Sequence, residues 1–344
     1  MDTFIPSNIV ALWVIFACTS VIILFSGKFL ASSTDTIAVR TGLGHTFVGF
    51  VLLATATSIP ELATGISSIQ LLDQPDIAAG DVFGSNLFNL LIIGILDVFW
   101  RNEPILRSVA DSNTIAIATF GIIVFILAIQ AIFLHEIWTG LNNFLVSPIA
   151  IAIFIVFLIS LFLVHKISSS STNDNDATST SHNSPLYRTY LIYLISALII
   201  VITAIFLSFT AEKIAHVLDW ETSFVGTQFV AFSTSLPELA SSIAAVRLGV
   251  PKLAIAGLLG SNLFNMGFVM FIDELAYTNG SFWGAIDETH IFTGSTAILM
   301  TTIVIAAMAI KSRRKIMNYF SIESILLISA YTATSVLIFL YSKN

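Results

Sequence analysis

The hexapeptide Gly84-Ser-Asn-Leu-Phe-Asn89 recurs without a change as Gly260-Ser-Asn-Leu-Phe-Asn265. Upstream of each copy a longer pair of segments also aligns: residues 49–63 contain the sequence TSIPELA, and residues 226–240 contain TSLPELA. Six identical residues in a row, two of them Asn, seldom recur by chance inside apolar segments. The chain is therefore an internal duplication, and the repeated segments decide its fold.

The composition around these repeats indicates a membrane protein. Hydrophobic residues make up 56% of the 344 positions and charged residues only 10%, whereas a soluble domain carries about 25% charged residues. The 14 Lys and Arg are outnumbered by 21 Asp and Glu, which leaves no basic face for nucleic acid. Cys18 is the only cysteine, which excludes a disulfide scaffold and a cysteine-based zinc site.

Runs of about 20 mostly apolar residues mark helices that cross a bilayer. We predict an all-α polytopic membrane protein with ten such helices, five in each half of the chain. They cover residues 8–28, 45–71, 77–98, 113–134, 144–165, 189–211, 222–246, 253–274, 290–310 and 320–341.

A polar segment separates the two halves. Residues 167–187 are rich in Ser, Thr, Asn and Asp, and such a composition predicts a flexible linker. We therefore expect one membrane repeat over residues 1–166 and a second over 188–344. Of the 14 basic residues only Lys213 and Lys343 fall on the side of both termini. The positive-inside rule then predicts a cytoplasmic linker and outside termini in the plasma membrane.

Five helices per half make the second repeat cross the membrane in the opposite sense. Inverted repeats of this kind are typical of secondary transporters, whose sites lie near the midplane where the repeats meet. Glu61 and Glu238 are repeat partners, and each lies about midway along its predicted helix. A carboxylate at that depth costs several kcal/mol unless it is paired. No Lys, Arg or His interrupts the central part of any predicted helix, so a bound cation is the expected counter-charge.

Oxygen-bearing residues surround the two acids in sequence, as a hard cation requires. A Thr-Ser pair precedes each Glu, and each hexapeptide places Ser and Asn one helical turn apart. Pro60 and Pro237 release carbonyl groups about one turn earlier, those of Ala56 and Ser233 or their close neighbours. The candidate ligands are Glu61, Glu238, Thr57, Ser58, Thr234, Ser235, Ser85, Ser261, Asn89 and Asn265, with the carbonyls of Ala54 and Ala231.

Three other acids are placed by their positions in the predicted helices. Asp81 lies near the outer end of the third helix, and its repeat partner is Gly257, so the sequence leaves its role open. Asp97 and Asp273 each follow the repeated Asn by eight residues, near opposite membrane faces. We expect both to be solvated at helix ends.

The remaining repeat residues have structural interpretations. We expect Asn86 and Asn262 to bind backbone groups across helices, and Gly80 and Gly84 to allow close helix packing. Two histidines near helix ends are expected to be interfacial, His45 and His216.

At these motifs the sequence resembles the cation/calcium antiporter superfamily, in particular its prokaryotic sodium/calcium exchanger branch. A TS-x-PE motif followed by GSN-x-FN, present twice in opposite topology, is specific to that group. The resemblance implies that Glu61 and Glu238 bind calcium as central bidentate carboxylates. It assigns the Thr and Ser hydroxyls and the carbonyls of Ala54 and Ala231 to flanking sodium sites. It also implies that the first and sixth helices slide during transport and that a monomer is functional.

The chain departs from the family pattern at a few positions. Ala56 and Ser233 stand where the family usually has Gly, and Asn265 stands where some members have Asp. Only Glu61 and Glu238 then clearly supply formal charge, which balances one calcium, two sodium ions or two protons. The number of charges therefore leaves the driving ion and the stoichiometry open.

Sodium/calcium exchange by alternating access is the leading hypothesis for function, with no resident cofactor and no enzymatic activity. A proton/calcium antiporter is the close alternative, because two carboxylates in a low-dielectric site also bind protons. A cation channel is less favoured, since the halves are inverted and not arranged around a pore axis. An intramembrane hydrolase lacks a basic group to activate a Ser.

Overall fold

The computed structural model describes residues 8–41, 54–100, 103–138, 140, 144, 146–170, 186–310, 315 and 319–342. Nearly all of them are helical, which confirms the predicted all-α class. The helices are α1 (Ile9–Thr41), α3 (Ala54–Thr57), α4 (Ile59–Leu72), α5 (Pro75–Phe99), α6 (Ile105–Ser108), α7 (Ser112–Ile137), α8 (Pro148–Ser170), α9 (Leu186–Leu218), α10 (Thr222–Val225), η3 (Gly226–Val230), α11 (Ala231–Thr234), α12 (Leu236–Arg247), α13 (Pro251–Phe264), η4 (Asn265–Val269), α14 (Met270–Ala276), α15 (Phe282–Ala285), α16 (Thr289–Ile310) and α17 (Ile322–Tyr341).

The described helices correspond to eight of the ten predicted membrane crossings, or to nine if a bent helix is included. Eight helical runs are long and apolar enough to cross a membrane, and a ninth follows if the bent run from Thr222 to Arg247 is one crossing. Only residues 54–71 of the second predicted helix are described, so the count of ten stays a prediction. Helices α8 and α9 extend into both ends of the predicted linker, whose middle lies outside the described residues, as does His45.

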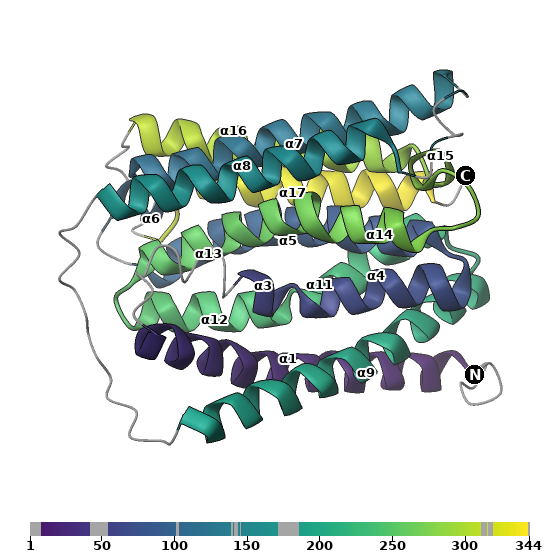
Figure 1. Ribbon diagram of the computed structural model, residues 1–344, viewed down its shortest axis with the longest axis horizontal. Helices are drawn as coiled ribbons and strands as arrows, with labels where there is room; N and C mark the ends of the chain where they lie inside the picture. Colours follow the sequence, from purple (N-terminus) through teal and green to yellow (C-terminus); the bar gives the residue numbers. More distant parts are fainter. Residues whose placement is uncertain are drawn as a thin grey trace.

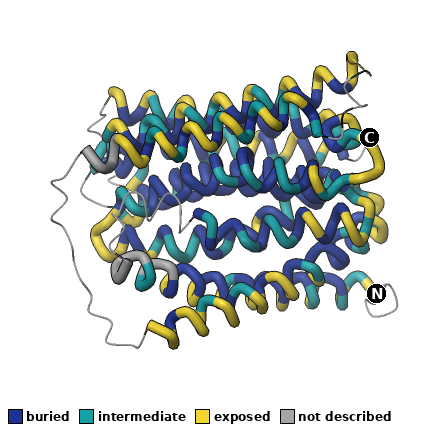
Figure 2. Tube along the Cα trace, viewed as in Figure 1, coloured by how far each residue is buried: buried dark blue, intermediate teal, exposed yellow. Residues whose placement is uncertain are grey.

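The helices lie roughly side by side in a bundle (Figure 1), with α1 and α9 along one face and α7, α8 and α16 along the opposite one. Helices α5 and α13 lie between them and are the most deeply buried (Figure 2). Large apolar side chains on the outer helices are exposed, such as Phe25 on α1 and Phe162 on α8. An apolar exterior around a buried centre is what a lipid environment requires.

The equivalent turns of the two repeats lie at opposite ends of the bundle. The turn between α4 and α5 lies at the end where α1 begins, whereas the turn between α12 and α13 lies at the other end (Figure 1). The repeated segments therefore run in opposite senses along the bundle. This local arrangement agrees with the inverted repeat that the odd number of helices predicts.

Each repeat contains a helix that is broken at the same place. Helix α3 ends at Thr57 and α4 begins at Ile59, while α11 ends at Thr234 and α12 begins at Leu236. The intervening Ser58 has φ −88° and ψ 7°, and Ser235 has φ −85° and ψ 6°. In each case Pro follows within the first turn of the next helix, where its missing N–H costs no hydrogen bond. The second break bends its helix by 43°.

Glycine residues bring the broken helix of the second repeat against α5. A Cβ atom on Gly84 would lie 2.7 Å from the Ala231 Cβ, and one on Gly80 would lie 2.9 Å from the Ser223 carbonyl oxygen. A Cβ on Gly226 would in turn lie 2.9 Å from the Ile77 carbonyl oxygen. The predicted packing role of Gly80 and Gly84 is confirmed, and it draws the two repeats together at their centres.

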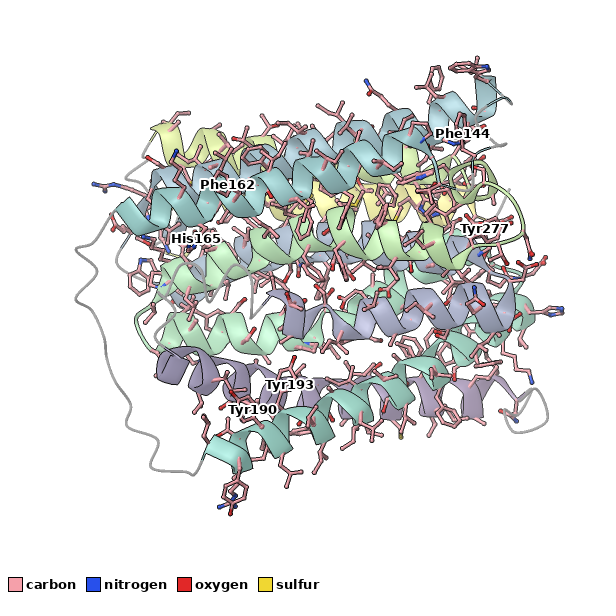
Figure 3. The ribbon with its side chains drawn as sticks, in the orientation of Figure 1. Phe144, Phe162, His165, Tyr190, Tyr193 and Tyr277 are labelled. Atoms are coloured by element: carbon pink, nitrogen blue, oxygen red, sulfur yellow. The ribbon has the colours of Figure 1, made fainter. Side chains whose placement is uncertain are left out.

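Aromatic side chains occur near both ends of the bundle. Tyr190 and Tyr193 lie on α9 toward the end where that helix begins, and Tyr277 and Phe144 lie near the opposite end (Figure 3). Tyr190 is 42% exposed. The amphipathic rings of Tyr favour the two membrane–water boundaries, so the placement of these tyrosines is consistent with a bilayer around the bundle.

Replacement of Gly84 by Ala tests the close approach. The added methyl group has no room against η3 and α11, and we expect a loss of about 1–3 kcal/mol in stability. The measurement is thermal unfolding of the purified protein in detergent. Gly121→Ala is the matched control, because a Cβ there meets nothing within 4 Å. Equal unfolding temperatures for the two variants would contradict the packing role.

Candidate cation-binding site

The site is built around two carboxylates in the centre of the molecule. Glu61 lies in the first turn of α4 and Glu238 in the first turn of α12, directly after the two helix breaks. Their side chains are 0% and 2% exposed. Neither takes part in the ion pairs formed among the described residues. Both Glu238 carboxylate oxygens and the Glu61 Oε2 atom lack a hydrogen-bond partner. Buried carboxylates in this condition need a positive charge or protons.

Hydroxyl groups from the two repeats meet in two equivalent pairs beside these acids. Thr57 Oγ1 and Ser261 Oγ are 3.2 Å apart, and their repeat partners Thr234 Oγ1 and Ser85 Oγ are 3.3 Å apart. The first pair lies next to the Glu238 carboxylate, and Ser85 lies next to Glu61. Each pair thus joins one repeat to the other, and the symmetry of the sequence is present in the contacts.

The break residues and their carbonyl partners lie at the same level. Ser235 donates from its Oγ to Glu61 Oε1 at 3.5 Å, whereas Ser58 Oγ is buried without a partner. The Ala54 carbonyl accepts the Ser58 N–H at 3.0 Å, and the Ala231 carbonyl accepts the Ser235 N–H at 3.1 Å. A carbonyl oxygen has two lone pairs, and the Thr hydroxyl of the same repeat approaches each carbonyl as a second donor, Thr57 Oγ1 at 3.4 Å from the Ala54 oxygen and Thr234 Oγ1 at 3.2 Å from the Ala231 oxygen.

The amide side chains of the hexapeptides are all buried, but they differ in their bonding. Asn89 Nδ2 donates to Asn262 Oδ1 at 2.9 Å, and Asn262 Nδ2 donates to the Asn86 carbonyl at 3.1 Å. The predicted backbone contact is therefore present for Asn262, whereas the Asn86 amide has no partner. The Asn265 amide also lacks a partner and stands at the first residue of η4. π-helical turns of this kind are frequent at functional sites.

All twelve predicted ligand positions are described, and the hydroxyl and carboxylate members lie together between the repeats. Within the described part of the chain, no three acidic, His or Cys side chains come close enough to hold a metal by themselves. A cation here would therefore depend on hydroxyl, amide and carbonyl oxygens together with the carboxylates, which is the mixed oxygen set that calcium and sodium accept.

Sequence reasoning placed Asp81 near the outer end of its helix and missed its connection to the site. The side chain is fully buried, and its Oδ1 atom accepts hydrogen bonds from Thr234 Oγ1 at 2.7 Å and Ser85 Oγ at 3.3 Å. The spacing of four residues between Asp81 and Ser85 places both on one helix face, and this was the signal that could have revealed it.

The expectation that Asp97 and Asp273 are solvated at helix ends is wrong, since both are 0% exposed. Asp97 accepts the backbone N–H groups of Ile105 and Ser321 at 2.9 and 2.7 Å, and Lys315 Nζ lies 3.0 Å from its Oδ1 atom. Asp97 is therefore an anchor for two connecting segments.

Asp273 has a different environment although it is the repeat partner of Asp97. Both of its carboxylate oxygens lack a partner among the described residues. It packs against α4 at Gly65, where a Cβ atom would lie 2.8 Å from the Asp273 Cγ atom. Gly65 lies one turn beyond Glu61 on the same face of α4, so the acid is adjacent to the site.

Comparison with known proteins identifies the family. The family model described as sodium/calcium exchanger protein matches residues 11–163 and again residues 189–340. The chain belongs to the sodium/calcium exchanger family. The members of this family are cation exchangers of membranes, and the match confirms the resemblance that the repeated motifs indicated.

Individual members of the family are distant in sequence. An uncharacterized membrane protein of Methanocaldococcus jannaschii is 27% identical over 257 residues, 74% of this chain and 78% of that protein. Sodium/calcium exchanger MaX1 of Methanosarcina acetivorans is 24% identical over 286 residues, 75% of this chain and 81% of that protein.

Two solved structures show that the exchanger shares their fold. The structure of native YfkE has a TM-score of 0.67 at 19% identity and covers 97% of this chain and 93% of its own. A structure of the sodium-calcium exchanger NCX_Mj has a TM-score of 0.61 at 20% identity, with coverage of 96% and 99%. At this level of identity the match speaks for the fold alone.

Replacement of Lys315 by Met tests the anchor at Asp97. The substitution leaves a buried carboxylate without its counter-charge, and we expect a loss of about 3–5 kcal/mol. Lys252→Met is the control, because its ion pair with Asp111 is partly exposed and should contribute only about 0–1 kcal/mol. Unfolding in detergent measures both. A Lys315→Met protein as stable as the control would contradict the anchor.

Proposed function

We propose that this exchanger moves calcium across the membrane in exchange for sodium, by alternating access to one central site. The observation that carries the proposal is the pair of buried, unpaired carboxylates, Glu61 and Glu238, set among hydroxyl groups from both repeats. Two carboxylates balance the charge of one calcium ion, and bare oxygens are the ligands that calcium prefers.

The flanking hydroxyl pairs are the proposed sodium positions. Thr57 with Ser261, and Thr234 with Ser85, place neutral oxygens on either side of the carboxylates. Sodium accepts such oxygens together with the carbonyls of Ala54 and Ala231. Ions in these positions share the Glu61 and Glu238 oxygens with calcium. Sodium entry therefore disfavours calcium binding through competition for ligands and like-charge repulsion.

The helix breaks suit a site that must open in turn to each side. Irregular backbone at membrane depth is tolerated where it lines an ion cavity, and the two breaks lie on opposite repeats. We further propose that the exchanger lies in the plasma membrane, with the linker in the cytoplasm and both termini outside, and that a monomer suffices. No resident cofactor is part of this proposal, because the ions are cargo.

Replacement of either central acid by Gln should abolish exchange. Glu61→Gln and Glu238→Gln keep the shape of the side chain but remove the charge that a divalent ion needs. The measurement is calcium uptake into proteoliposomes driven by an opposed sodium gradient. Glu136→Gln, on an exposed acid at the end of α7, is the control and should transport normally. Undiminished uptake by either central variant would refute the proposed site.

The driving ion is tested by changing the gradient alone. Proteoliposomes that contain the wild-type protein are given a sodium, proton or potassium gradient of equal size, and calcium flux is followed with an indicator dye. We expect flux only with sodium, because the flanking positions are built from hydroxyl and carbonyl oxygens. Calcium movement that follows a pH gradient in sodium-free buffer would instead establish proton/calcium exchange.

A further inference from the structure

The two flanking hydroxyl pairs occupy equivalent positions in the two repeats, but the charges next to them differ. Thr234 and Ser85 both donate to Asp81 Oδ1, at 2.7 and 3.3 Å. At the position equivalent to Asp81, the second repeat has Gly257. The pair formed by Thr57 and Ser261 therefore has no corresponding acid from its own helix. One flanking position has an additional acid on its own helix, and the other does not.

The contacts of Asp81 with the described protein groups do not compensate the charge of its carboxylate. The side chain is 0% exposed, and its Oδ2 atom has no hydrogen-bond partner. The ion pairs among the described residues do not include it. A carboxylate taken out of water with one bare oxygen costs several kcal/mol unless a positive charge compensates it. The two hydroxyl donors hold Oδ1 in place and leave Oδ2 available to an ion.

The neighbouring acids increase the need for a cation at this place. Asp81 is close enough to Glu61 and to Glu238 for the carboxylates to repel one another. Three mutually repelling acids in a buried site are stable together only when bound cations or protons compensate their charges. A single calcium ion leaves one of the three charges unbalanced, whereas monovalent ions can balance each of them.

We propose that Asp81 is an anionic ligand of a monovalent-cation position formed with Thr234 and Ser85, which makes that position stronger than its counterpart at Thr57 and Ser261. Asp81 then supplies the third negative charge that Asn265 does not. This inference rests on the proposed sodium sites, and it adds that the two sites are unequal and that the central site contains three charges instead of two.

The test is the stabilisation of the purified protein by sodium, which requires neither calcium nor transport. Bound ions raise the unfolding temperature by mass action, so a sodium titration against choline at constant ionic strength gives an apparent affinity. In Asp81→Asn we expect the sodium concentration for half-maximal stabilisation to rise about tenfold or more, since one nearby charge is lost. Asp219→Asn, at an exposed acid, should match the wild type.

Asp81→Ser is a second neutral variant that keeps an oxygen atom and guards against a folding defect specific to Asn. Both Asp81 variants should also need more sodium to displace half of the bound radioactive calcium in equilibrium dialysis. Unchanged sodium dependence in a folded Asp81 variant overturns the inference and leaves the proposed function intact. Wild-type protein that binds sodium in an Asp81-dependent manner, yet exchanges no calcium, supports the inference and contradicts the proposed function.

Discussion

Buried negative charge without a basic partner is the constraint on which the rest of the structure depends. Glu61 and Glu238 lie at the centre of a bundle whose exterior is apolar, and no described Lys or Arg reaches them. The fold places polar groups beside these two carboxylates. Broken helices place Ser235 and the Thr–Ser pairs beside the carboxylates, and glycines on α5 allow the second repeat to come close enough to do so.

Duplication explains how one arrangement supplies oxygens from opposite directions. Ser58 and Ser235 have nearly the same backbone angles, and the hydroxyl pairs across the repeats differ in length by only a tenth of an ångström. Two broken helices, one entering from each side of the membrane, can each be interrupted at the same depth. The two break residues, Ser58 and Ser235, are both 0% exposed, so the irregular backbone at the breaks is covered by protein.

Apolar runs, the exact repeat and the two prolines were sufficient to predict the helical class, the backbone disturbance before each Glu and the hydroxyl residues that meet between the repeats. Those features depend on local sequence and on symmetry, which a sequence displays directly. The environments of Asp81, Asp97 and Asp273 could not be predicted in this way. The burial of Asp97 depends on Lys315 and Ser321, which lie more than 200 residues away in the sequence. The position of a residue relative to its helix end does not indicate which distant segments will cover that residue.

The two acids that follow the repeated Asn have diverged in a manner that gives the molecule a direction. Asp97 is neutralised by Lys315 and two backbone donors, whereas the described residues offer no such compensation to Asp273. They lie toward opposite ends of the bundle. When Asp273 is ionised, the electrostatic potential is therefore more negative on its side of the site than on the side of the neutralised Asp97. An ancestral half-molecule could have no such polarity, because the polarity arises from the differences between the two repeats.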